Sequence, residues 1–107
     1  LVQGCVVVRK AFADAHPNEV KAFLSEYQAS IEYLRAEPDQ AGQMIEEAGI
    51  FAKAAVAAKA IPNCNVCFVS GAEMQAPLTA FFTALSTVAP QSTGGSVPGD
   101  DFYCVLK

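Results

Sequence analysis

Two cysteines spaced as Cys64-x-x-Cys67 are the side chains best suited to chemistry in this sequence. In thioredoxin-type proteins such a pair opens a helix, whose dipole favours the thiolate of the first cysteine. Here the chain continues with Phe68 and Val69, and a helix-start signal comes only at Ser70. If the segment is extended, positions 64 and 67 point to opposite faces. Our first interpretation is therefore structural thiols, with a disulfide, or a metal or redox role, as alternatives.

Other reactive residues lack the partners that catalysis or metal binding requires. The sequence holds no second CxxC, so a zinc site would have to include Cys5 or Cys104. His16 precedes Pro17 at an expected helix start, where a capping or surface role is the default for a histidine without a neighbouring nucleophile. We therefore predict no catalytic residue, no metal site and no cofactor, and a protein that is not an enzyme.

Two acidic pairs and a glycine pair have simpler explanations than catalysis. Glu46 and Glu47 are adjacent, and adjacent residues of a helix do not face each other. The pair Asp100-Asp101 follows a glycine, as in many turns. The pair Gly94-Gly95 lacks the preceding strand and following helix of a phosphate-binding loop.

Composition narrows the class of protein. A chain of 107 residues fits one domain, and 52% hydrophobic residues is too many for a disordered segment. The net charge is -4, and most of the seven basic residues are scattered, which argues against nucleic-acid binding. No apolar run approaches the roughly 20 residues that span a bilayer.

The N-terminal half predicts a strand followed by three helices. Residues 5–9 are short, apolar and β-branched, which favours a buried strand, with a connection over 11–16. One apolar stripe predicts a helix over 17–36, ended by Pro38. The stripe consists of Val20, Phe23, Leu24, Tyr27, Ile31 and Leu34. A second helix is expected from an Asp39 cap to a stop at Gly49. The alanine-rich residues 52–60 predict a third, able to pack closely against a neighbour.

The C-terminal half predicts one more helix. Residues 63–69 are expected to be extended or a loop, and Ser70 and Glu73 have the spacing of a capping box. An amphipathic pattern runs to Val88. Pro77 implies either a first turn at this position or a kink. A loop over 89–100 and a short strand over 101–107 complete the chain.

The predicted fold class is an α/β fragment, mostly helical, with about four helices and one or two short strands. One or two strands do not form a stable sheet alone. The first residue is Leu1 rather than methionine. We therefore expect residues 1–107 to be a single piece of a longer protein, whose other parts pair with the strand near Val6–Val8. Isolated, such a piece should self-associate through its unpaired strand edges.

Three runs follow one another in the N-terminal half: Gly4-Cys-Val-Val-Val-Arg-Lys-Ala-Phe12, His16-Pro-Asn-Glu-Val-Lys-Ala-Phe-Leu24 and SIEYLRAEPDQAGQMI from Ser30. Their order resembles the C-terminal third of solute-binding proteins of ABC importers, in the nitrate, taurine and aliphatic-sulfonate group. The resemblance continues with KAIPNCNVCFVSGAEMQAPL from Lys59 and GGSVPGDDFY from Gly94, which are similar to the bacterial lipoprotein branch. Together these runs cover nearly the whole chain.

This resemblance implies a two-lobed, type II periplasmic-binding-protein fold, of which the chain forms part of one lobe. The family binds a small solute between its lobes and delivers it to membrane permease subunits by hinge closure. It acts outside the cytoplasm, in the periplasm or lipid-anchored through an N-terminal segment. Small anions are the first solutes to consider. The cleft-side candidates in this sequence are Gln3, Gly4 and Cys5, and the piece alone is not expected to bind solute.

A second hypothesis belongs to a different class. The chain would then be a small helical interaction module, or a thiol or redox protein that uses Cys64 and Cys67. Thiol titration separates the two hypotheses, because only a redox protein requires an activated thiol at position 64.

Overall fold

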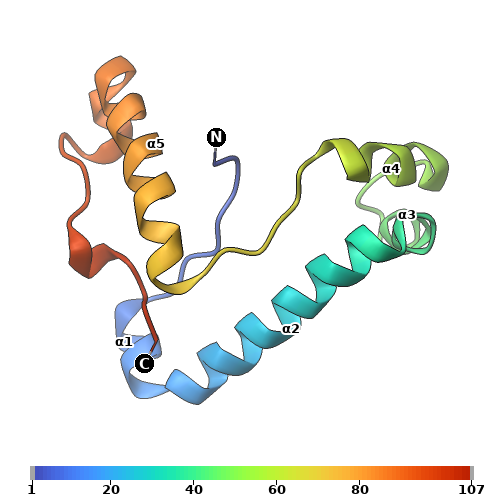
Figure 1. The fold of residues 1–107 in the computed structure, drawn as a ribbon, viewed down its shortest axis with the longest axis horizontal. Coiled ribbons are helices and arrows are strands. Elements are labelled where there is room, and N and C mark those ends of the chain that lie inside the picture. Colours follow the sequence, from blue (N-terminus) through green and yellow to red (C-terminus); the bar gives the residue numbers. More distant parts are fainter. Residues whose placement is uncertain (1, 107) are drawn as a thin grey trace. The chain divides into compact units, whose positions relative to one another are not determined.

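The computed structural model describes residues 2–106, and within them the regular structure is helical (Figure 1). It contains five α-helices, four of at least seven residues: α1 (Lys10–Ala15), α2 (Pro17–Ala36), α3 (Pro38–Glu47), α4 (Ala54–Ala60) and α5 (Gln75–Val88). Short 3-10 segments are η1 (Ile61–Asn63), η2 (Gly71–Met74), η3 (Pro90–Thr93) and η4 (Asp100–Phe102). Residues up to 20 and from 69 on form one compact unit, and residues 21–68 form a second.

Helix α2 has the bounds that its apolar stripe predicted, residues 17–36. Proline fits its first position, since an N–H there would have no partner within the helix. Within the stripe, Val20 and Ile31 are buried, whereas Phe23 is 49% exposed. Phe23 stacks on Tyr27, and Tyr27 meets the edge of Phe68 at 6.2 Å. The predicted apolar stripe is therefore present on α2, but only some of its side chains are buried by other described residues.

Helices α3 and α4 pack closely because small residues face each other (Figure 1, green). Ala41 and Gly42 are buried on α3, and Ala57 and Ala58 are buried on α4. The connection turns at Gly49, whose φ of 71° lies in the left-handed region that glycine adopts at low cost. The predicted glycine stop and the predicted close packing of the alanine-rich helix are both confirmed.

The Glu46 carboxylate caps the start of α4, where it accepts a hydrogen bond of 2.5 Å from the Ala54 amide. A carboxylate at this end satisfies a free N–H and complements the helix dipole. We expect Glu46→Ala to lower the free energy of unfolding by about 1 kcal/mol. Glu47→Ala is the matched control, since the neighbouring side chain makes no such bond within residues 2–106. Urea denaturation followed by circular dichroism measures both, and equal effects would contradict the assignment.

Helix α5 is held along its side by the C-terminal segment of the same unit (Figure 1, orange and red). The Gln75 amide donates to Asp100 at 2.6 Å, and the hydroxyls of Thr79 and Tyr103 share a hydrogen bond of 2.9 Å. Phe102 meets the edge of Phe82 at 5.8 Å. Tyr103 is buried by these contacts.

Pro77 is the third residue of α5 and therefore lies in its first turn. Proline is tolerated there because the first amides of a helix have no acceptor within it. The predicted capping box is wrong, since Ser70 makes no side-chain cap bond. Gly71, the first residue of η2, has a left-handed φ of 64°, and the regular α-helix begins only at Gln75. The Asp39 cap is also wrong: Glu37 is the N-cap and Asp39 lies in the first turn of α3.

Both expected strands are absent from residues 2–106, which corrects the predicted α/β class to all-helical. Residues 5–9 have no regular structure, and Val7 is 79% exposed rather than buried. Of the strand expected over 101–107, residues 101 and 102 belong to η4, and residue 107 lies outside the described range. A strand requires a hydrogen-bonded neighbour, and the described residues supply none. The connection expected over 11–16 is helix α1, which an ion pair of 2.6 Å between Lys10 and Asp14 supports.

Candidate functional site

The predicted cleft-side residues Gln3, Gly4 and Cys5 lie in the irregular segment before α1, and all three are exposed. Nothing lies within 4 Å of the position that a Cβ on Gly4 would take. Neither of the two hollows described below includes these residues. The structure therefore does not bring them together with other polar groups within residues 2–106.

Cys64 and Cys67 are free thiols, and both are exposed. Cys64 follows the last residue of η1, and its amide donates to the Ile61 carbonyl at 3.1 Å. It thus lies at the C-terminal end of the helical stretch formed by α4 and η1. The dipole of a helix is negative at that end, so it does not supply the thiolate stabilisation of a redox CxxC.

The turn after Cys64 is made by Asn65, whose φ of 53° is left-handed. Asparagine is one of the few residues other than glycine that adopts this conformation readily. After the turn, Cys67 lies in the wall of a hollow of about 520 Å³, whereas Cys64 is not part of that wall. The two thiols of the motif therefore have different surroundings.

This hollow, which we call the Arg35 hollow, is lined by residues of α2, of η1 and of the segment after η1. They are Arg35, Ile61, Pro62, Asn65, Val66 and Cys67. Its wall combines apolar side chains, including buried Ile61, with one cation, one amide and one thiol. Its volume falls in the range of small-molecule sites, roughly 300–1,000 Å³.

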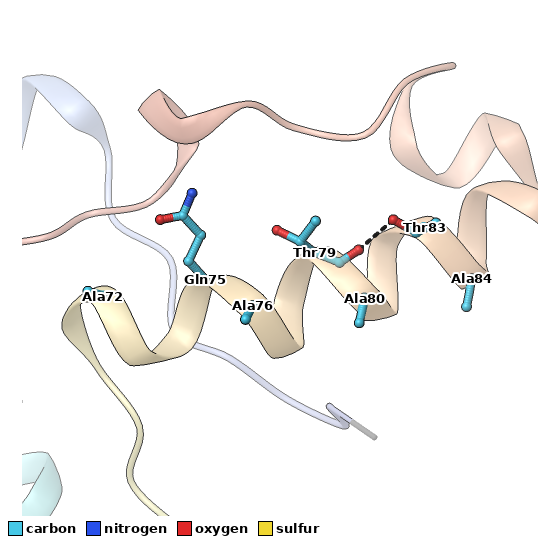
Figure 2. Close-up of a pocket in the computed structure, with 7 residues that line it drawn as sticks. All are labelled: Ala72, Gln75, Ala76, Thr79, Ala80, Thr83 and Ala84. Carbon is cyan, nitrogen blue, oxygen red and sulfur yellow. Dashed lines mark hydrogen bonds between the residues drawn. The ribbon is translucent and has the colours of Figure 1, made fainter.

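A second hollow of about 840 Å³ follows one side of α5 (Figure 2). Ala76, Ala80 and Ala84 point to one side of the helix, and Gln75 and Thr79 point to the other. Gln75 and Thr79 already bond the C-terminal segment, and the Thr83 hydroxyl donates to the Thr79 carbonyl at 2.8 Å. What remains is a row of small residues without a free polar group, which offers a ligand little specificity.

The other titratable groups singled out in the sequence are dispersed over the surface. The His16 ring is tilted by 34° against that of Phe12 at a centroid distance of 4.8 Å, and His16 Nδ1 lies 3.8 Å from a Glu19 carboxylate oxygen. The Asp14 hydrogen bond, together with its charge, raises the pKa of exposed Lys10. Within residues 2–106, no three His, Cys, Asp or Glu side chains lie close enough to hold a metal ion.

Sequence reasoning missed Arg35 as a candidate site residue. It lies beside the apolar stripe of α2 and, in sequence, resembles any solvent-facing cation at the end of a helix. Cys67 was singled out only with Cys64, although the structure places it with Arg35 instead. No sequence pattern connects residues 35 and 67, since two helices and their turns separate them.

Fold and site together define a helical chain, over residues 2–106, with a hollow of mixed polar and apolar lining and many exposed large apolar side chains. None of the helices described has the length and apolarity to cross a membrane. Comparison of the chain with protein-family models, curated proteins and solved structures finds no match. Its function must therefore be argued from its own residues.

Proposed function

We propose that this chain is part of the solute-binding component of an ABC importer, which carries a small solute to membrane permease subunits outside the cytoplasm. It would form part of one lobe, with its helices covering a sheet whose other strands lie elsewhere in a longer protein. The proposal begins from the order and spacing of the sequence runs that resemble this family, from Gly4 to Tyr103.

The observation that carries the proposal is the exposed β-branched segment before α1. Val6, Val7 and Val8 are 51%, 79% and 39% exposed. Within residues 2–106, no backbone hydrogen bond joins residues 2–8 to another segment, and Arg9 has the extended dihedrals φ −68° and ψ 132°. Exposed apolar side chains and unpaired backbone groups are both costly in water, and pairing within a sheet would remove both costs.

Uncovered apolar residues on the helices and their connections support the same interpretation. Ile50 is 75% exposed, Phe51 is 48% exposed and Val88 is 85% exposed. No side chain within residues 2–106 is completely buried. A domain with its own core normally encloses several large apolar side chains, so these surfaces are suited to packing against further structure. Self-association of the isolated chain through the same surfaces remains a prediction.

In the proposed protein the chemistry is binding and transfer rather than catalysis. Solute would be held between two lobes, and hinge closure would present the closed form to the permease. Residues 3–5 would lie near the lobe crossover, at the edge of the cleft. Membrane attachment would come from an N-terminal lipid anchor of the longer protein.

The thiol alternative lacks a specific supporting observation. Cys64 is at the C-terminal end of a helical stretch, and of the two cysteines only Cys67 lines the Arg35 hollow. Thioredoxin-type chemistry needs a thiolate at a helix N-terminus with its partner nearby. The solute-binding proposal is therefore preferred.

Calorimetry on two proteins tests the proposal. Taurine, nitrate and a short alkyl sulfonate are titrated into the present chain and into the product of the complete coding sequence that contains it. We expect no micromolar binding to the chain, because one wall of the cleft is missing, and binding with Kd of roughly 1 μM to the longer protein.

Two results would count against the proposal. One is micromolar binding of any of these solutes to the present chain alone. The other is a complete coding sequence that contains no further α/β lobe to pair with residues 5–9.

A further inference from the structure

We propose that the Arg35 hollow is a binding site for a small carboxylate with a short apolar tail. The proposal rests on residues other than the cleft-side candidates, because none of the residues that line the hollow belongs to the segment near residues 3–5. Each proposal can therefore fail without the other.

Arg35 supplies the one charge among the described residues in the wall of the hollow. Arg35 is in the last turn of α2, and no carboxylate of residues 2–106 forms an ion pair with it. Its guanidinium also makes no hydrogen bond to a side chain of the described chain. A guanidinium offers donors in a planar fork that matches the two oxygens of a carboxylate. Arg35 lines the hollow, and its unpaired guanidinium is thus available to an anion.

Ile61, Pro62 and Val66 form the apolar part of the wall. Ile61 is 7% exposed, and Pro62 and Val66 lie beside it in the same wall. These side chains leave no second cation for a polyanion such as a phosphate ester. They favour a ligand whose charged head meets Arg35 and whose alkyl tail covers Ile61 and Val66.

The turn at Asn65 adds a second polar side chain to the wall. Asn65, in its left-handed conformation, is part of the wall, and its amide makes no side-chain hydrogen bond within residues 2–106. Its N–H donors add to those of Arg35 for a bound carboxylate. Cys67 is also part of the wall and provides a reporter, since a ligand bound in the hollow would shield its thiol.

Alkylation of fully reduced protein with iodoacetate and with iodoacetamide tests the charge. In both reactions the cysteine thiolate displaces iodide to form an S–C bond, and buffer takes up the thiol proton. The iodoacetate-to-iodoacetamide rate ratio is measured by mass spectrometry at Cys67 and at Cys64, the matched control outside the hollow. We expect the ratio at Cys67 to be roughly three- to ten-fold higher, as for one solvent-screened unit charge nearby.

Variants at position 35 show whether the guanidinium is the cause. Arg35→Gln should bring the ratio at Cys67 to that of Cys64, and Arg35→Lys should retain part of the difference because the charge remains. Circular dichroism verifies that both variants keep the helical content of the native chain. Equal ratios at the two cysteines, or a difference that survives Arg35→Gln, would overturn the proposal.

Ligand binding can also be tested on the native chain, by measuring how far a bound ligand protects the Cys67 thiol from alkylation. Sodium hexanoate should slow the reaction of iodoacetamide at Cys67 at least about two-fold, with half-protection in roughly the millimolar range for so small a ligand. The rate at Cys64 should not change. Hexanol, the neutral analogue, should protect much less. Equal protection by hexanol, or none by hexanoate, would overturn the assignment to a carboxylate.

Discussion

Replacement of Gly42 by alanine is expected to separate α3 from α4 and to lower the stability of the unit formed by residues 21–68. A Cβ at this position would lie 2.5 Å from the Ala54 carbonyl oxygen and 3.1 Å from the Ala58 Cβ. The nearer atom belongs to the backbone, so no side chain can rotate away to make room.

Two opposing effects decide the magnitude. Overpacking of this severity costs about 3 kcal/mol, whereas alanine in a helix interior is more favourable than glycine by about 1 kcal/mol. We therefore expect Gly42→Ala to lower the free energy of unfolding by about 2 kcal/mol. Urea denaturation gives the change, and hydrogen exchange of the α4 amides should show local loss of protection.

A matched control lies at the next residue of the same helix. Gln43 is exposed, and Gln43→Ala adds no atom to the α3–α4 contact. Its effect should stay within about 0.5 kcal/mol. A Gly42→Ala variant as stable as the native chain would show that the two helices do not pack as closely as described.

Truncation of Tyr103 should release the C-terminal segment from α5. Tyr103 is 8% exposed, shares a hydrogen bond with Thr79 and meets the edge of Phe102 at 5.5 Å. Removing a buried aromatic side chain costs about 3 kcal/mol. Tyr103→Ala should therefore lower the free energy of unfolding of the unit that contains α5 by about that amount. Limited proteolysis should then cut residues 94–106 faster, whereas Val105→Ala, at an exposed position, should have little effect.

A double-mutant cycle isolates the hydrogen bond from the packing. Tyr103→Phe and Thr79→Val each remove one hydroxyl and should each cost about 1 kcal/mol. Because both variants lose the same bond, the double variant should cost clearly less than their sum. Additive losses would mean that the two hydroxyls do not bond in solution.

Several features of the fold could be predicted because they depend on residues close together in sequence. The bounds of α2 follow from an uninterrupted apolar period between Pro17 and Pro38. Gly49 was recognisable as a stop because few residues other than glycine adopt a left-handed φ cheaply. Helix α4 was expected from its alanines, but residue 52 was the wrong start, since alanine propensity marks no boundary.

The wrong predictions have three different physical causes. The residues at 5–9 have strand propensity, but a strand forms only with a neighbour, and the described residues offer none. Helix α1 was missed because six residues are too few to show a period, while the Lys10 and Asp14 pair supports it locally. The capping box at Ser70 failed because the left-handed Gly71 overrides the spacing of side chains.

The amino-acid sequence by itself determined where the longer helices form, because apolar periodicity, prolines and glycines act over one or two turns of chain. Only the tertiary structure decided which side chains meet. Arg35 and Cys67 line one hollow because α3, α4 and the Asn65 turn carry the chain back to the end of α2. The placement of Arg35 and Cys67 in one hollow depends on the packing of small residues between α3 and α4. No local pattern in the sequence encodes it.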